Sequence, residues 1–66
     1  MEVIVPEEFD SKTISELKLR SRFGLNLLAV SYNGKFEINP EPNRRLRKGE
    51  AMVVIGSNQG IDQLPI

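Results

Sequence analysis

Two arginines and one asparagine are the side chains best suited to bind a ligand. Arg20 and Arg22 carry fixed positive charge, and Asn26 places a carboxamide at the start of an otherwise apolar segment. A carboxamide that becomes covered must find hydrogen-bond partners. Asn26 therefore either ties down the turn before it or contacts a ligand. Likewise, the arginines either lie over the core and face water or grip an anion, and the residues leave both alternatives open.

The densest positive cluster lies further along the chain, at Arg44, Arg45, Arg47 and Lys48. Such a cluster can grip phosphate. No aromatic side chain is interleaved with it, as single-stranded nucleic acid binding would favour, and the 9 basic and 9 acidic residues of the chain cancel. We therefore expect a solvated turn with paired surface charges and no nucleic acid partner.

The remaining polar residues do not indicate an enzyme. Glu37 and Glu50 are separated acids with no visible partner, which argues against a general acid–base pair. Cysteine and histidine are absent, so the chain offers neither a thiolate nucleophile nor an ordinary zinc site. Gly56-Ser57 before a short helix could bind an anion, but this pair is a common way to leave a strand. We expect no catalytic residues, no metal and no cofactor in this domain.

Size and hydropathy limit the elements that can position these groups. At 66 residues the chain forms a single domain over residues 1–66 and buries only about 60% of its unfolded surface. Its apolar runs are far shorter than the roughly 20 residues that span a bilayer. We therefore expect a cytoplasmic domain with no direct membrane insertion.

The first half of the chain predicts a strand and a short helix. Glu2–Val5 is a β-branched strand, stopped by Pro6 and suited to a sheet edge. Thr13 and Glu16 form a capping box, so a helix begins there. Leu19 falls about 140° from Ile14 on an ideal helix, which predicts that this helix ends near Lys18 or Leu19. An irregular turn then runs from residue 20 to Gly24, where a positive φ is favoured.

The second half predicts a hairpin, a further strand and a final helix. Leu25–Tyr32 and Lys35–Ile38 flank Asn33-Gly34, the residue pair of a type I′ turn. A two-residue loop sets Tyr32 opposite Lys35 and Ala29 opposite Ile38. Ala51–Gly56 does not alternate, so we expect it to be buried on both faces. Ser57 then caps a short helix that carries Ile61 and Leu64.

Strict alternation in the hairpin predicts which face is the core. The expected core face carries Leu25, Leu27, Ala29, Phe36 and Ile38. The second face carries Asn26, Leu28, Val30, Tyr32, Lys35 and Glu37. That second face is too apolar to lie bare in water, so another element or a second subunit should cover it.

Six motifs, in order and at matching spacing, resemble the TrkA-C domain, also called RCK-C. They are Thr13–Leu17, Leu19–Val30, Asn33-Gly34, Asn39-Pro40, Leu46–Glu50 and Val53–Ser57. The resemblance covers nearly the whole chain. It implies an α+β module with the order β-α-β-β-β-α, in two layers, with a mainly antiparallel four-stranded sheet, assembled as a homodimer.

The resemblance also implies a function: a ligand-sensing, dimerising regulatory domain of a potassium or other cation transport system. Its partners would be a transporter or channel and a Rossmann-type nucleotide-binding domain. Cyclic di-AMP would bind at the dimer groove through Arg20 and Asn26, with Leu28 in the groove wall. Lys18 departs from the family, whose members often have an acidic residue there. The alternative is a purely structural dimerisation module without a ligand.

Overall fold

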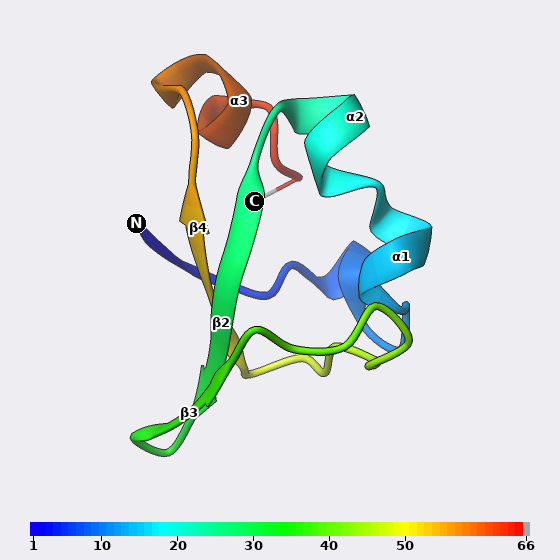
Figure 1. Ribbon diagram of the computed structural model, residues 1–66, viewed down its shortest axis with the longest axis vertical. Coiled ribbons are helices and arrows are strands. Elements are labelled where there is room, and N and C mark those ends of the chain that lie inside the picture. Colours follow the sequence, from blue (N-terminus) through cyan, green and yellow to red (C-terminus); the bar gives the residue numbers. More distant parts are fainter. Residues whose placement is uncertain (66) are drawn as a thin grey trace.

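The computed structural model describes residues 1–65 and has eight regular elements (Figure 1). In order they are β1 (Glu2–Ile4), η1 (Glu7–Phe9), α1 (Ile14–Leu17), α2 (Leu19–Phe23), β2 (Asn26–Tyr32), β3 (Lys35–Ile38), β4 (Ala51–Ile55) and α3 (Asn58–Asp62). The predicted α+β class and the order β-α-β-β-β-α are confirmed, with a pair of short helices in the first helical position.

All four strands form one antiparallel sheet in the order β1-β4-β2-β3. β1 lies at an edge, as Pro6 predicts. Asn33 and Gly34 have φ values of 51° and 76°, the left-handed pair that a type I′ turn requires. The predicted hairpin register, Tyr32 opposite Lys35 and Ala29 opposite Ile38, is confirmed.

The helical segment between β1 and β2 is interrupted at Lys18. The Thr13–Glu16 capping box forms in full, as predicted, and α1 ends after one turn. Lys18 then adopts a left-handed conformation at φ 49° and ψ 49°, and a second helix, α2, follows it. The expected irregular turn after residue 19 is therefore wrong. The break rotates α2 relative to α1, which lets Leu17 and Leu19 both reach the core.

The helices and the long loop after β3 pack against one face of the sheet. The core cluster contains Val3, Val5, Phe9, Leu17, Leu19, Leu25, Val30, Leu46, Met52, Val54, Ile61 and Leu64. η1 brings Phe9 into this cluster from a segment that reads as a polar connection. Leu46 anchors the basic loop to the same core. The result is a two-layer module with its other sheet face uncovered in the single chain.

A β-bulge at Leu28 changes the face assignment of the hairpin. Leu27 lies opposite Val54 and Ala29 opposite Val53, so Leu28 is an extra residue in β2. An inserted residue shifts every later side chain to the other face. Val30 is therefore in the core, and the expectation that Phe36 and Ile38 share the core face is wrong. Both point away from the core and are more than half exposed.

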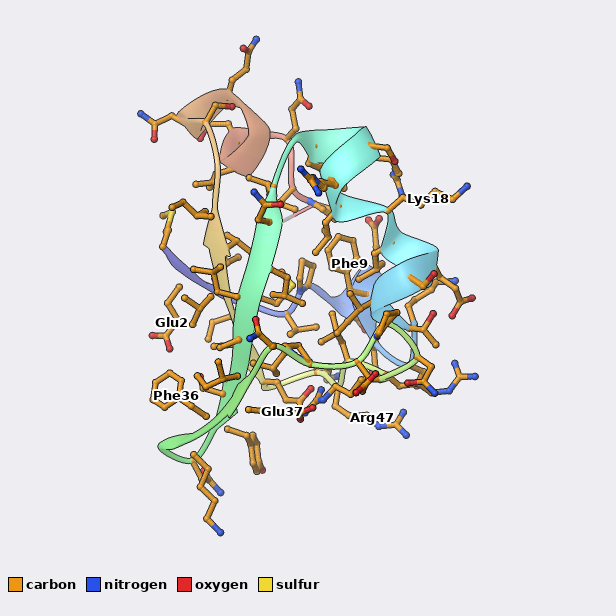
Figure 2. All side chains as sticks on the ribbon, in the orientation of Figure 1. Glu2, Phe9, Lys18, Phe36, Glu37 and Arg47 are labelled. Carbon is orange, nitrogen blue, oxygen red and sulfur yellow. The ribbon has the colours of Figure 1, made fainter. Side chains whose placement is uncertain are left out.

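The uncovered side of the sheet, here called the outer face, carries apolar residues on all four strands. It is formed by Ile4, Phe36, Ile38, Val53 and Ile55, around the small side chains of Ala29 and Ala51. Figure 2 shows Phe36 and Glu2 on the opposite side of the sheet from Phe9. β4 is thus not buried on both faces in the single chain. The absence of alternation in its sequence reflects a second apolar face that remains open.

The C-terminal helix is fixed by a close backbone approach at Gly60. A side-chain carbon at this position would meet the carbonyl oxygen of Phe23 at the end of α2. Only glycine lets α3 lie this close to α2. The glycine therefore serves packing, although it weakens the helix itself by about 1 kcal/mol relative to alanine.

Candidate ligand-binding groove

α1, α2 and the first residues of β2 enclose a groove of about 340 Å³. It is lined by Ile14, Ser15, Lys18, Leu19, Arg20, Ser21, Leu25, Asn26 and Leu27. The lining combines four apolar side chains, three hydroxyl or amide groups and two cations, and it contains no carboxylate. Such a surface suits an anion that also carries a flat apolar part.

The structure brings Arg20 and Asn26 together in this groove. Both side chains are exposed. Within residues 1–65, neither forms a side-chain hydrogen bond or an ion pair. Asn26 therefore does not tie down the preceding turn, and both groups keep their full capacity to bind a ligand.

Arg22 and Leu28 lie outside the groove. The Arg22 guanidinium carbon stacks 5.0 Å from the ring centroid of Phe23, so this arginine covers the edge of the core as an arginine stem commonly does. Leu28 is the bulge residue of β2 and is 44% exposed. Its role as a site residue stays a prediction that depends on a second subunit.

Seven of the nine groove residues were not among the predicted binding residues, and Leu27 and Lys18 are two of them. Leu27 lines the groove directly beside Asn26, and Lys18 lines it at the junction between the two helices. The apolar pattern of β2 marks Leu27 as a core residue only. The signal for Lys18 was its charge beside Arg20, which the sequence alone shows only as a departure from the family.

The second basic cluster is tied into the fold. Arg44 donates to both oxygens of Glu50 at 2.8 Å and to Glu37 at 2.9 Å. Arg45 and Arg47 donate to the carbonyl and hydroxyl oxygens of Ser11. The expected paired surface charges are confirmed, whereas the expectation that Glu37 and Glu50 have no partner is wrong.

Glu50 is the one largely buried carboxylate among the described residues. The Arg44 guanidinium, together with the backbone N–H of Arg47, lowers the pKa of the Glu50 carboxyl, and Glu50 in turn raises the pKa of Arg44. Glu16 also has a lowered pKa, because its carboxylate accepts the backbone N–H of Thr13. These acids stabilise loops and caps and lie outside the groove lining.

Three other features of the described part of the chain bear on function. The Ser57 hydroxyl accepts the backbone N–H of Gly60 at 3.1 Å and so caps α3, which accounts for Gly56-Ser57 without an anion. Residues 1–65 contain no cluster of three or more potential metal ligands. None of the helices in that range has the length and hydropathy needed to cross a membrane.

The model of the TrkA-C domain family matches residues 1–64. The chain belongs to the TrkA-C domain family. A curated relative, the Ktr system potassium uptake protein A of Bacillus subtilis (strain 168), is 28% identical over 61 residues. The match covers 92% of this chain and 28% of that protein, so the chain spans little more than a quarter of the length of this relative.

Solved TrkA-C (RCK C) domains have the same fold. The RCK C domain of the potassium transport protein KtrA, in complex with cyclic di-AMP, has a TM-score of 0.89 and 27% identity, with 96% of this chain and 74% of that chain covered. The RCK_C dimer of S. agalactiae BusR with the same ligand has a TM-score of 0.84 and 24% identity, covering 97% and 82%. A BusR complex with promoter DNA also matches, but only 32% of that chain is covered.

Proposed function

We propose that this chain is a dimeric, ligand-sensing regulatory domain of a potassium or other cation transport system, and that cyclic di-AMP binds in the groove of α1, α2 and β2. The observation that carries the proposal is the pairing of two free polar groups, Arg20 and Asn26, with apolar walls in one groove. The similarity to a KtrA domain in complex with this ligand supports it.

The ligand matches the groove in its chemistry. Cyclic di-AMP has two anionic phosphodiester groups and two flat adenine bases. A guanidinium binds a phosphate through two parallel hydrogen bonds, and a carboxamide can both donate to and accept from a base or phosphate. Ile14 and Leu27 offer the apolar surface on which a base can lie. The domain thus acts by binding rather than by catalysis.

A second copy of the chain completes the site. Asn26 pairs with Ile55 across the sheet, so the groove opens beside the apolar outer face. Four residues of that face, Ile4, Phe36, Ile38 and Ile55, are each more than half exposed. A second copy on this face would bury these side chains and bring two grooves close together, as a ligand with two equivalent halves requires.

Regulation then follows from linkage. A ligand held between two copies stabilises one arrangement of the pair over others, by its difference in affinity for them. We propose that a Rossmann-type domain and a cytoplasmic face of a transporter or channel are attached to this pair in the whole protein. The TrkA-C module would convert groove occupancy into a change of their relative position.

Isothermal titration of the 66-residue chain with cyclic di-AMP tests the ligand. We expect saturable binding with one ligand for two chains. Arg20→Ala should abolish most of the affinity, whereas Arg22→Ala, which removes the same charge from outside the groove, should leave it unchanged. No heat and no thermal stabilisation of the wild-type chain at millimolar ligand would reject cyclic di-AMP as its ligand.

Sedimentation equilibrium at micromolar concentration tests the dimer. The wild-type chain should sediment at twice its monomer mass of 7.5 kDa. Phe36→Glu, which places a charge among the exposed apolar side chains of the outer face, should give a folded monomer. Lys35→Glu, one residue away and on the other face, is the matched control. A folded wild-type monomer would contradict the dimer.

The open outer face also favours a second candidate, a structural dimerisation module with no ligand. Under this alternative the Phe36→Glu variant behaves as above, but no groove substitution changes any binding signal. A DNA-binding role through Arg44 to Lys48 has less support. The arginines of this cluster are engaged by carboxylates and by Ser11, so they are less available to phosphates.

A further inference from the structure

Lys18 occupies a backbone conformation that its side chain does not favour. Its φ of 49° and ψ of 49° lie in the left-handed region, where glycine and asparagine are preferred. The other non-glycine residues of the described chain with positive φ are one serine and two asparagines. A long charged side chain at such a position raises the free energy of the folded state.

Among residues 1–65, no polar contact of the Lys18 side chain offsets this cost. Within residues 1–65 its ammonium forms no hydrogen bond and no ion pair, and the residue is exposed. Its backbone carbonyl accepts from the Ser21 hydroxyl and the Arg22 N–H, contacts that any residue could make. Figure 2 shows the side chain extending from the junction of α1 and α2. Backbone strain that no stabilising contact offsets is typical of functional positions.

The surroundings of Lys18 leave its charge available. It lines the groove with Arg20, and no carboxylate is among the lining residues. The nearest acid in sequence, Glu16, is already held: its carboxylate accepts the Thr13 N–H at 2.8 Å and lies 3.8 Å from Arg45. Each groove therefore presents two positive charges that are not neutralised within the described chain.

We propose that Lys18 is a specificity-determining residue that makes a second cationic contact to the phosphate of the bound dinucleotide, beside Arg20. This inference rests on the proposed function. In a two-fold pair of grooves, one Lys18 and one Arg20 face each of two phosphodiesters. The site then selects a ligand with two separated anionic groups over mononucleotides and neutral nucleosides, because each anion meets two donors.

Titration of cyclic di-AMP into Lys18 variants of the 66-residue chain tests the proposal. Lys18→Asn keeps a residue that tolerates the left-handed conformation but removes the charge, and we expect about tenfold weaker binding. The thermal midpoint should rise by about 4 °C as the strain is relieved. Lys18→Arg should retain affinity. Lys35→Asn removes the same charge far from the groove and should bind like the wild type.

Salt dependence separates a charge contact from a change of shape. The difference in affinity between wild type and Lys18→Asn should shrink between low and high ionic strength, because salt screens exposed charges. Equal binding by wild type and Lys18→Asn, or a loss in Lys18→Arg as large as in Lys18→Asn, would overturn the role of Lys18 and leave the proposed function standing. No binding by the wild type would overturn both.

Discussion

Arg44 and Arg20 carry the same guanidinium but meet different surroundings. Arg44 is held by Glu50 and Glu37 at 2.8 to 2.9 Å, with its side chain three-quarters buried. Arg20 is exposed in the groove of α1, α2 and β2, without a partner among residues 1–65. The dense cluster from Arg44 to Lys48 thus stabilises the fold, whereas Arg20 is available to a ligand. The two arginines differ in whether the cation is paired, not in how many cations lie nearby.

The largest effect should come from breaking the paired region. Arg44→Ala leaves the Glu50 carboxylate largely buried without its counter-charge, and losing one partner of such a pair destabilises a protein by about 3 kcal/mol. Urea unfolding followed by circular dichroism measures this loss. If Arg44→Ala unfolds at the same urea concentration as the wild type, the ion pairs of Arg44 do not stabilise the fold. Arg44 and Arg20 would then not differ in their structural role.

Arg20→Ala should weaken ligand binding but leave the stability of the fold nearly unchanged. Removing a charged partner from the phosphate should weaken cyclic di-AMP binding by about thirtyfold, or about 2 kcal/mol. Its free energy of unfolding should stay within about 0.5 kcal/mol of the wild type, since no contact within the described chain is lost. Calorimetric titration and urea unfolding on the same sample check both halves. A large loss of stability would show that Arg20 stabilises the fold, as Arg44 does.

Acid should weaken the Arg44–Glu50 pair. The pKa of Glu50 is below its usual value of 4.5 in the folded chain. The contribution of Glu50 to the free energy of unfolding is therefore present above about pH 5 and is lost as pH falls through the folded-state pKa. Glu50→Gln should lower stability near neutral pH by about 1.5 kcal/mol and flatten the decline below pH 5. Unfolding curves from pH 3 to 7 provide the measurement. If the stability of Glu50→Gln falls as steeply in acid as that of the wild type, other carboxylates cause the loss.

The smallest effect should come from the exposed rim of the basic cluster. The Arg45–Glu16 pair is separated by 3.8 Å, with both side chains more than half exposed, and exposed pairs contribute little. Arg45→Ala should change stability by less than about 1 kcal/mol and leave cyclic di-AMP affinity unchanged. A marked loss of ligand affinity in this variant would show that the basic cluster takes part in the site.

Features determined by neighbouring residues were predictable from sequence. The Thr13–Glu16 capping box, the Asn33-Gly34 turn and the hairpin register depend on contacts within a few positions, and all three are confirmed. The candidate groove was predictable in part: Arg20 and Asn26 were selected by type and by family resemblance, and they do share one groove. Their role in binding stays a prediction.

Features determined by tertiary packing were missed. The bulge at Leu28 has no marker such as glycine, yet it moves Val30 into the core and Phe36 out of it. The break at Lys18 replaced an expected turn by a second helix, because burying both Leu17 and Leu19 outweighs the preference of lysine for negative φ. Phe9 likewise reaches the core from a segment that meets the other core residues only in the folded chain. The Arg44–Glu50 pair, six positions apart, depends on the path of the loop that joins the two residues.

Chemical-shift mapping of the ¹⁵N-labelled chain during titration with cyclic di-AMP tests whether the groove is the binding site. We expect saturable shifts of backbone amides in α1, α2 and the start of β2, including Arg20, Asn26 and Leu27. Amides of the Arg44–Lys48 segment should stay unchanged. Shifts confined to Arg44–Lys48, or none anywhere at saturating ligand, would contradict the assignment of the unpaired groove as the binding site.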